Sequence, residues 1–262
     1  MNETYKVQVQ GLVDDLKAVF THAGLGGEAG EYKLLAQSFL YKFLNDKFLY
    51  QAKVLDESNT YENLLAMSEE DYDWLLEDIG TSTAWLKPDQ LIETLHRQQN
   101  ESSFYETFEN TLNQIAIDNN DIFSVHTDGD TAIRLFDERL ITDTISDSSK
   151  RNEVAKAIIN LLARVKFDES IFSQGFDFFS TLFEYMIKDY NKDGGGKYAE
   201  YYTPHSVAKI IADILVGDDK PQNVRIYDPS AGSGTLLMNL ASRIGVDKTT
   251  VYSQDISQKS SN

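Results

Sequence analysis

The sequence of 262 residues contains no cysteine, and this absence excludes disulfide bonds, thiol nucleophiles and thiolate metal sites. Only four histidines are present, each far from the next along the chain: His22, His96, His126 and His205. A metal site built on histidines needs several of them close together, which this spacing does not favour. We therefore expect no metal site in this protein.

The sequence also lacks a run of about 18 apolar residues, and its N-terminus lacks the basic-then-apolar pattern of a secretory signal. We therefore expect a cytoplasmic protein without a membrane contact. With only four prolines, 41% hydrophobic residues and 11% aromatic residues, the composition is typical of a globular protein. The length is sufficient for one or two domains of roughly 100 to 200 residues each.

Basic residues are scarce, since 24 Lys and Arg stand against 42 Asp and Glu and the net charge is −18. A protein that grips DNA by neutralising phosphates is normally basic on the gripping face, so the charge taken alone argues against autonomous DNA binding. The acidic excess is concentrated in residues 51–130, which contain 18 Asp and Glu and three basic residues. This stretch is either a solvated helical surface or a partner-facing or DNA-mimicking surface, and both interpretations stay open.

Residues 1–166 have the apolar spacing of a mostly helical domain. Helical spacing is found over residues 12–20 and, after a glycine-rich segment, over residues 35–48. Further helices are predicted over residues 71–79, 102–117 and 153–165. The second helix carries an apolar stripe that is typical of core packing rather than of a cofactor site. The stripe consists of Phe39, Leu40, Phe43, Leu44 and Phe48. Residues 121–144 are less periodic, and a short irregular or β element is left open there.

Residues 167–262 form a second predicted domain with a different order of elements. We predict a helix over 176–187, a glycine loop at 194–196, a helix over 207–215, a buried strand over 224–227, a loop over 228–235, a helix over 236–244 and a strand over 250–253. Thr203 as N-cap with Pro204 just inside the helix is favourable chemistry for the start of the 207–215 helix. The last four elements are half of a doubly wound nucleotide-binding sheet.

The loop Asp228-Pro-Ser-Ala-Gly-Ser-Gly-Thr235 directly follows the first of the two strands. In such a unit the glycines, here Gly232 and Gly234, let a ligand approach the backbone, and an acidic residue after the second strand meets ribose hydroxyls. Asp255 has that position. Gly232 and Asp255 are 23 positions apart, in agreement with the roughly 20 residues that separate these groups in one βαβ unit.

Two features of nucleotide-binding loops are missing. Leu237 replaces the third glycine of the dinucleotide fingerprint, and no Gly-Lys-Ser or Gly-Lys-Thr follows the loop. Both absences disfavour NAD and ATP as ligands. Asp228, which opens the loop, is better suited to a ligand with positive charge. S-adenosyl-L-methionine (SAM) carries both an ammonium and a sulfonium group and is such a ligand.

Asp228-Pro-Ser-Ala-Gly-Ser-Gly234 resembles the first motif of amino-group DNA methyltransferases, and Tyr202-Thr-Pro204 resembles their upstream cofactor motif. The wider arrangement, ending in Gln254-Asp255, resembles the N6-adenine-specific modification subunit of type I restriction-modification systems. The resemblance runs along the whole chain and is strongest over residues 177–262. It implies a mostly α N-terminal domain followed by the start of an α/β, Rossmann-like SAM-dependent methyltransferase domain.

The resemblance implies that SAM is the cofactor and that three segments bind it. The first would wrap the methionine end of SAM and consists of Glu200, Tyr201, Tyr202, Thr203, Pro204 and His205. The second would lie against the cofactor in front of a helix N-terminus and consists of Asp228, Gly232, Ser233, Gly234 and Thr235. The third is Asp255, which would hold the ribose where many relatives have glutamate. His205 is expected to satisfy the helix start without a role in proton transfer.

In this family the chemistry belongs to an Asn-Pro-Pro-aromatic motif, which accepts hydrogen bonds from the adenine amino group and stacks on the flipped base. The sequence contains no Pro-Pro pair, so we expect no catalytic residue in this chain and interpret it as the truncated front part of a longer protein. Two strands alone leave sheet edges unpaired. We therefore expect weak or no SAM binding and no methylation by these residues alone.

For the intact protein, the resemblance implies a site-specific, adenine-specific DNA methyltransferase that acts after the base has left the duplex. The implied partners are DNA, a specificity (S) subunit that reads the target, a second modification subunit and a restriction (R) subunit that needs ATP. A partner would then supply much of the positive surface that this acidic chain lacks. Two alternatives stay open: a methyltransferase that acts on RNA or protein, and a non-enzymatic partner-binding scaffold with a vestigial cofactor fold.

Overall fold

The computed structural model describes residues 3–26, 29–81, 83–123, 125–126, 132–172, 203–232 and 234–255. It divides the chain into two compact units, Asn2–Ser173 and Gln174–Asn262. The domain boundary predicted at 166/167 lies shortly before this division. None of the described helices is long and apolar enough to cross a membrane. Among the described residues, no group of three or more His, Asp and Glu side chains could hold a metal ion.

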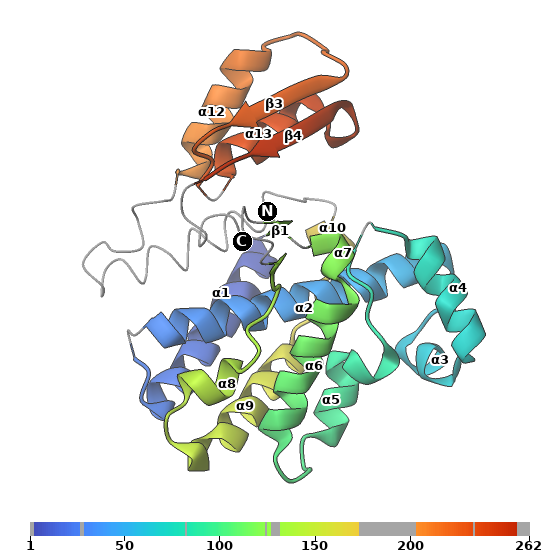
Figure 1. Ribbon diagram of the computed structural model, residues 1–262, viewed down its shortest axis with the longest axis vertical. Helices are drawn as coiled ribbons and strands as arrows, with labels where there is room; N and C mark the ends of the chain where they lie inside the picture. The colour runs from blue at the N-terminus through green and yellow to red at the C-terminus, as the bar shows by residue number, and fades with distance from the viewer. Residues whose placement is uncertain are drawn as a thin grey trace. The chain divides into compact units, whose positions relative to one another are not determined.

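The first unit is built mainly from helices (Figure 1). Its elements are α1 (Glu3–Ala23), α2 (Ala29–Leu55), α3 (Tyr61–Ala66), α4 (Glu69–Ile79), η1 (Pro88–Gln90), α5 (Ile92–Gln98), α6 (Phe104–Asp118), α7 (Asn120–Phe123), β1 (Val125–His126), β2 (Ala132–Ile133), α8 (Leu140–Thr144), η2 (Ser148–Lys150), α9 (Arg151–Arg164) and α10 (Glu169–Phe172). The predicted helices are confirmed as α1, α2, α4, α6 and α9. The segment left open contains α7, α8 and a short antiparallel pairing of β1 with β2.

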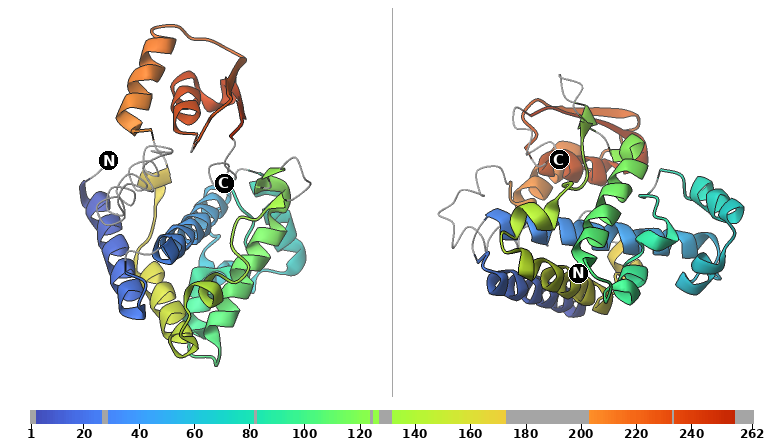
Figure 2. Two further views of the ribbon diagram at one scale, coloured as in Figure 1. Left: turned by 60° about the vertical axis from the view of Figure 1, so that its left-hand side comes forward. Right: turned by 60° about the horizontal axis from the view of Figure 1, so that its bottom comes forward.

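The core of the first unit lies where α9 contacts α1, α5 and α6. Figure 2 shows α1 and α9 side by side. The buried face of α9 includes Ile158 and Leu162. On α2, Phe39 and Phe48 of the predicted stripe are buried, while Tyr41 meets Phe108 of α6 edge to face at 6.1 Å between ring centroids. The interpretation of the stripe as core packing is therefore confirmed.

A buried ion pair on α2 connects distant parts of the first unit. Lys42 and Asp46 are 3% and 7% exposed, and Lys42 Nζ lies 2.8 Å from Asp46 Oδ2. The same carboxylate accepts hydrogen bonds from Phe167 N at 2.7 Å and from the Asn45 side chain at 2.8 Å. Burial lowers the pKa of Lys42, and the charge of Asp46 partly offsets that effect. Asp46 therefore compensates a buried ammonium group and also fixes a backbone amide.

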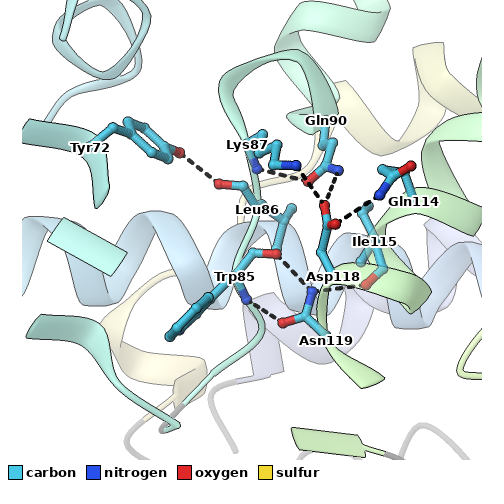
Figure 3. Close-up of polar contacts among 9 residues, drawn as sticks. All are labelled: Tyr72, Trp85, Leu86, Lys87, Gln90, Gln114, Ile115, Asp118 and Asn119. Carbon is cyan, nitrogen blue, oxygen red and sulfur yellow. Dashed lines mark hydrogen bonds and ion pairs between the residues drawn. The ribbon is translucent and has the colours of Figure 1, made fainter. Parts of the chain in front are cut away.

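Asn119 follows α6, and its side chain pairs with both the N–H and the carbonyl group of Trp85, which lies in an irregular segment of backbone (Figure 3). Its side-chain oxygen accepts from Trp85 N at 2.6 Å, and its Nδ2 donates to Trp85 O at 2.8 Å and to Ile115 O at 2.9 Å. The neighbouring Asp118 lies 3.2 Å from Lys87 Nζ. Because Asn119 is 1% exposed, these bonds satisfy groups that water does not reach.

The second unit contains a parallel pair of strands. Its described elements are α12 (His205–Val216), β3 (Val224–Asp228), α13 (Thr235–Ile244), η3 (Val246–Lys248) and β4 (Thr249–Ser253). The register of β3 with β4 runs from Val224 opposite Thr249 to Asp228 opposite Ser253. The predicted order of strand, glycine loop, helix and parallel strand is therefore confirmed.

The core formed by the described residues of the second unit is small. Its buried cluster consists of Ile226 on β3 with Leu237 and Ala241 on α13. The prediction that β3 is a buried strand is wrong, because only Ile226 is buried and both Arg225 and Tyr227 are exposed. Alternate strand residues point to opposite faces of a sheet, and the α13 cluster covers the face to which Ile226 belongs.

Replacing Asp46 by alanine is expected to destabilise the first unit by about 3 to 5 kcal/mol, because the Lys42 ammonium then stays buried without an opposite charge. Asp78→Ala is the control, since Asp78 lies exposed on α4 and its loss should change the free energy of unfolding by less than about 0.5 kcal/mol. Guanidinium unfolding followed by circular dichroism measures both. Equal unfolding midpoints for the two variants would contradict this assignment.

Candidate functional site

The predicted site residues on the two strands lie at the carboxyl ends of β3 and β4. Because the strands are parallel, Asp228 at the end of β3 and Asp255 shortly after β4 come to the same edge of the sheet. Gly232 N donates a hydrogen bond to Asp255 Oδ2 at 2.8 Å. The two positions that the sequence motif associates are therefore in direct contact.

Some of the predicted features lie outside the described residues. Among the site residues these are Glu200, Tyr201, Tyr202 and Ser233. Among the elements they are the helix over 176–187 and the glycine loop at 194–196. The remaining site residues belong to two places in the second unit, the β3–α13 loop with Asp255, and the start of α12.

The loop between β3 and α13 is held by hydrogen bonds that continue the pairing of the strands. Gln254 N donates to Asp228 O at 3.0 Å, and Ala231 N donates to Gln254 O at 2.9 Å. Asp228 Oδ1 accepts from Ser230 N at 2.9 Å, which forms a turn that bends the chain out of the strand. Gly234 N then donates to Ala231 O at 2.8 Å. One carboxylate oxygen of Asp228 therefore shapes the loop, a role that the sequence reasoning did not assign.

Both loop glycines adopt a left-handed backbone conformation. The φ angles of Gly232 and Gly234 are 54° and 72°, values that glycine adopts at little cost. A Cβ built on Gly234 would meet nothing within 4 Å beyond its chain neighbours. Open space therefore lies against the backbone directly before α13, whose first amides have no partners within the helix. This arrangement fits a ligand that approaches the backbone closely and accepts hydrogen bonds.

Asp255 fastens the loop through one oxygen and is only partly buried. An ionised carboxylate has about four acceptor sites, so the same group can hold a backbone amide and accept from further donors. Asp228 adds a second carboxylate at the same edge, which favours a ligand with positive charge. Beside them, Tyr227 OH donates to Gln254 Oε1 at 2.9 Å. The sequence reasoning assigned Asp255 to a ligand but missed that it also fixes Gly232.

Thr203 precedes α12, but the prediction that Thr203 caps this helix is wrong by one position. The helix begins at His205, Pro204 is the N-cap, and no side-chain capping hydrogen bond forms. Val207 N and Ala208 N donate to Pro204 O at 3.0 and 3.1 Å. The reason is the backbone of Pro204, whose ψ of 131° is extended rather than helical, so that the first turn starts one residue later.

His205 contacts the helix that follows the glycine loop. Its Nδ1 lies 3.0 Å from Nδ2 of Asn239 on α13, and Asn239 Nδ2 also donates to Thr235 O at 2.8 Å. The start of α12 therefore lies against the first turn of α13. The sequence reasoning missed Asn239. The available signal was a polar residue at a buried position in a leucine-rich helix.

Two surface hollows among the described residues lie in the first unit and contain none of the predicted site residues. One is between the α1 surface and the end of α9, and the other is on α4. The α4 hollow is lined by Glu69, Glu70, Asp73, Trp74 and Glu77. It belongs to the acidic stretch 51–130, and Trp74 is 61% exposed among the carboxylates. The helix α4 itself lies on the outer part of the helical unit (Figures 1 and 2).

Comparison with curated proteins finds relatives among restriction enzymes. The chain is 26% identical over 245 residues to the type I restriction enzyme MpnII methylase subunit of Mycoplasma pneumoniae, which covers 88% of this chain and 42% of that protein. It is 26% identical over 138 residues to the type I restriction enzyme MjaIX methylase subunit of Methanocaldococcus jannaschii, covering 48% of this chain and 24% of that protein. The chain therefore spans less than half the length of these relatives.

A solved structure and a family model agree with these relatives. The crystal structure of the type I restriction-modification system methyltransferase subunit from Streptococcus thermophilus has a TM-score of 0.64 at 22% identity, covering 97% of this chain and 54% of that chain. This likeness shows a shared fold. Residues 174–262 match the model of the N-6 DNA Methylase family. Residues 174–262 therefore resemble the N-6 DNA Methylase family, and the chain resembles type I restriction enzyme methylase subunits along most of its length.

Proposed function

We propose that this chain supplies the SAM-binding part of a type I modification subunit, which transfers a methyl group from SAM to the exocyclic amino group of adenine in DNA. The observation that carries the proposal is the contact of Gly232 with Asp255 at the carboxyl edge of a parallel sheet. Ligands of open α/β sheets bind outside this edge. The family match over residues 174–262 favours DNA over the RNA or protein substrates of the alternative interpretation.

The residues at this edge would hold SAM by complementary chemistry. Gly232 and Gly234 would let the cofactor lie against the backbone, and Asp255 would accept hydrogen bonds from the ribose hydroxyls. Thr203 or nearby amides would meet the methionine carboxylate, while the negative charge of Asp228 favours the positively charged end of the ligand. Bound SAM would supply a methyl group attached to a positively charged sulfur.

The charge of the chain bears on how the intact enzyme would meet DNA. Binding to DNA depends on neutralising phosphates, whereas this chain has a net charge of −18. We therefore propose that an S subunit supplies much of the DNA-binding surface and reads the target. A second modification subunit and an R subunit would complete the assembly. The target adenine would leave the base stack before transfer.

Addition of SAM is expected to shift the backbone amide NMR signals of Gly232, Gly234 and Asp255, with weak affinity. Asp255→Asn keeps an acceptor for Gly232 N–H but removes the charge and one acceptor, so Kd should rise about tenfold. Asp247→Asn makes the same change at an exposed residue before β4 and should alter Kd by less than about twofold. Signals that do not respond to SAM, or equal effects of the two variants, would refute the site.

A methyl group on the glycine loop is expected to interfere with SAM. Gly234→Ala places a Cβ in the open space before α13 and strains a backbone with φ of 72°, so SAM affinity should fall about tenfold or more. Gly217→Ala is the matched control, because Gly217 has φ of 54°, also has no atom near its Cβ position, and ends α12 away from the loop. Because its ψ of −133° makes alanine at least as strained at this position, the variant should lose stability while Kd stays unchanged. A similar loss of affinity in both variants would assign the effect to stability alone.

The 262-residue chain by itself is expected to transfer no methyl group to DNA, because its sequence contains no Asn-Pro-Pro-aromatic motif to hold the adenine amino group. The measurement is incorporation of radioactive methyl from SAM into duplex DNA, with an active adenine methyltransferase as the positive control. Incorporation above background by the purified chain would show that other residues of this sequence can act on the base.

A further inference from the structure

Asn239 is a polar residue of α13 that lies buried against the start of α12, and it is 7% exposed. The buried residues of the facing helix α12 are small or apolar, namely Ala208, Ala212 and Val216. A buried amide is costly unless it is hydrogen-bonded, whereas an apolar side chain at the same place needs no partner. The bonds that Asn239 makes therefore indicate what the residue does.

The two contacts of Asn239 fix the chemical state of its partner. The carbonyl oxygen of Thr235 can only accept, so the atom 2.8 Å away must be the amide nitrogen of Asn239. The same nitrogen lies 3.0 Å from His205 Nδ1, toward which it can donate its second hydrogen. Nδ1 is then the acceptor. This pairing requires the tautomer with its proton on Nε2.

This hydrogen-bonded pair joins the two segments that are proposed to bind the cofactor. His205 directly follows Thr203 and Pro204, and Thr235 directly follows Gly234. We propose that His205 and Asn239 are positioning residues that hold the Thr203–Pro204 segment at a fixed place beside the glycine loop. The cofactor role of this pair rests on the proposed function, since it assumes that both segments contact SAM.

A second polar contact joins the same helices away from the loop. Arg243 Nε donates to Asp213 Oδ1 at 2.7 Å, and Arg243 Nη2 donates to Gly217 O at 2.7 Å. The starts of α12 and α13 therefore meet through His205 and Asn239, while their ends meet through Arg243. The two helices run in the same direction, and each end has its own polar contact. Loss of the Arg243 contact should weaken the helix pair without moving the loop.

The state of His205 provides a test that does not need the cofactor. A two-bond proton–nitrogen NMR spectrum of the four histidines, assigned with His205→Gln, should show His205 with an unprotonated Nδ1 and a proton on Nε2 at neutral pH. Asn239→Leu should change the His205 signals because it removes the donor, whereas Arg243→Met should leave them unchanged. A proton on Nδ1 in the wild type, or no response to Asn239→Leu, would overturn the pairing.

The role in positioning is tested by titrating the same proteins with SAM and following amide signals. Asn239→Leu keeps a buried side chain, and it should raise Kd about tenfold through the lost placement of the segment. Asn239→Asp keeps the shape but turns a donor into an acceptor facing two acceptors, and it should raise Kd by a similar factor. Arg243→Met should leave Kd within about twofold even where thermal unfolding shows a comparable loss of stability.

The outcomes separate this inference from the proposed function. Equal losses of SAM affinity in the Asn239 and Arg243 variants would mean that the pair acts only through stability, and the positioning role would be overturned. If SAM shifts no signal in the wild type, the proposed function fails and the cofactor role of the pair fails with it. The histidine spectrum would then still decide whether the His205–Asn239 bond exists.

Discussion

The hydrogen bond from Gly232 to Asp255 is the interaction on which the arrangement of the second unit depends most. Among the residues that the structure describes there, only a few side chains form the buried cluster, so their apolar burial provides little to fix a loop that contains two left-handed glycines. Polar contacts hold the loop in its conformation instead. Asp255 fixes the middle of the loop, and Asp228 fixes its beginning through Ser230. The shape of the loop is therefore set by two carboxylates on its own sheet edge.

The use of carboxylates to hold the loop has a physical consequence for the binding of a ligand. A carboxylate that holds the loop and also accepts hydroxyl groups of a ligand couples the conformation of the loop to occupancy of the site, because both interactions draw on the same charge. The first unit is stabilised differently. Its core is rich in aromatic and aliphatic residues, and the buried side chain of Asn119 pairs with backbone groups of Trp85 and Ile115.

The sequence predicted the elements of both units better than their caps and contacts. Helical spacing located the main helices, and the motif spacing predicted that Gly232 and Asp255 would lie close together, as they do. It placed the α12 cap at Thr203 because local preferences favour threonine there, but the extended backbone of Pro204 starts the helix at His205. It also expected β3 to be buried, since alternation is difficult to judge in a strand of five residues.

The side-chain contacts that join one helix to other segments were outside the reach of sequence reasoning. Asn239 is recognised as important only when its partners on two helices are known, and Lys42 looks like any surface lysine of an amphipathic helix until Asp46 and Phe167 are placed around it. Such roles depend on which segments pack together, and a local pattern does not contain that information.

The bond from Phe167 N to Asp46 also fixes the segment that follows α9. The chain stays in the helical unit beyond Phe167, since Phe172 of α10 packs against Phe43 and Tyr50 of α2. The carboxylate that neutralises a core lysine therefore also holds the link between α9 and α10. Loss of this carboxylate would loosen both the core and the link, although Asp46 and Phe167 lie 121 positions apart in the sequence.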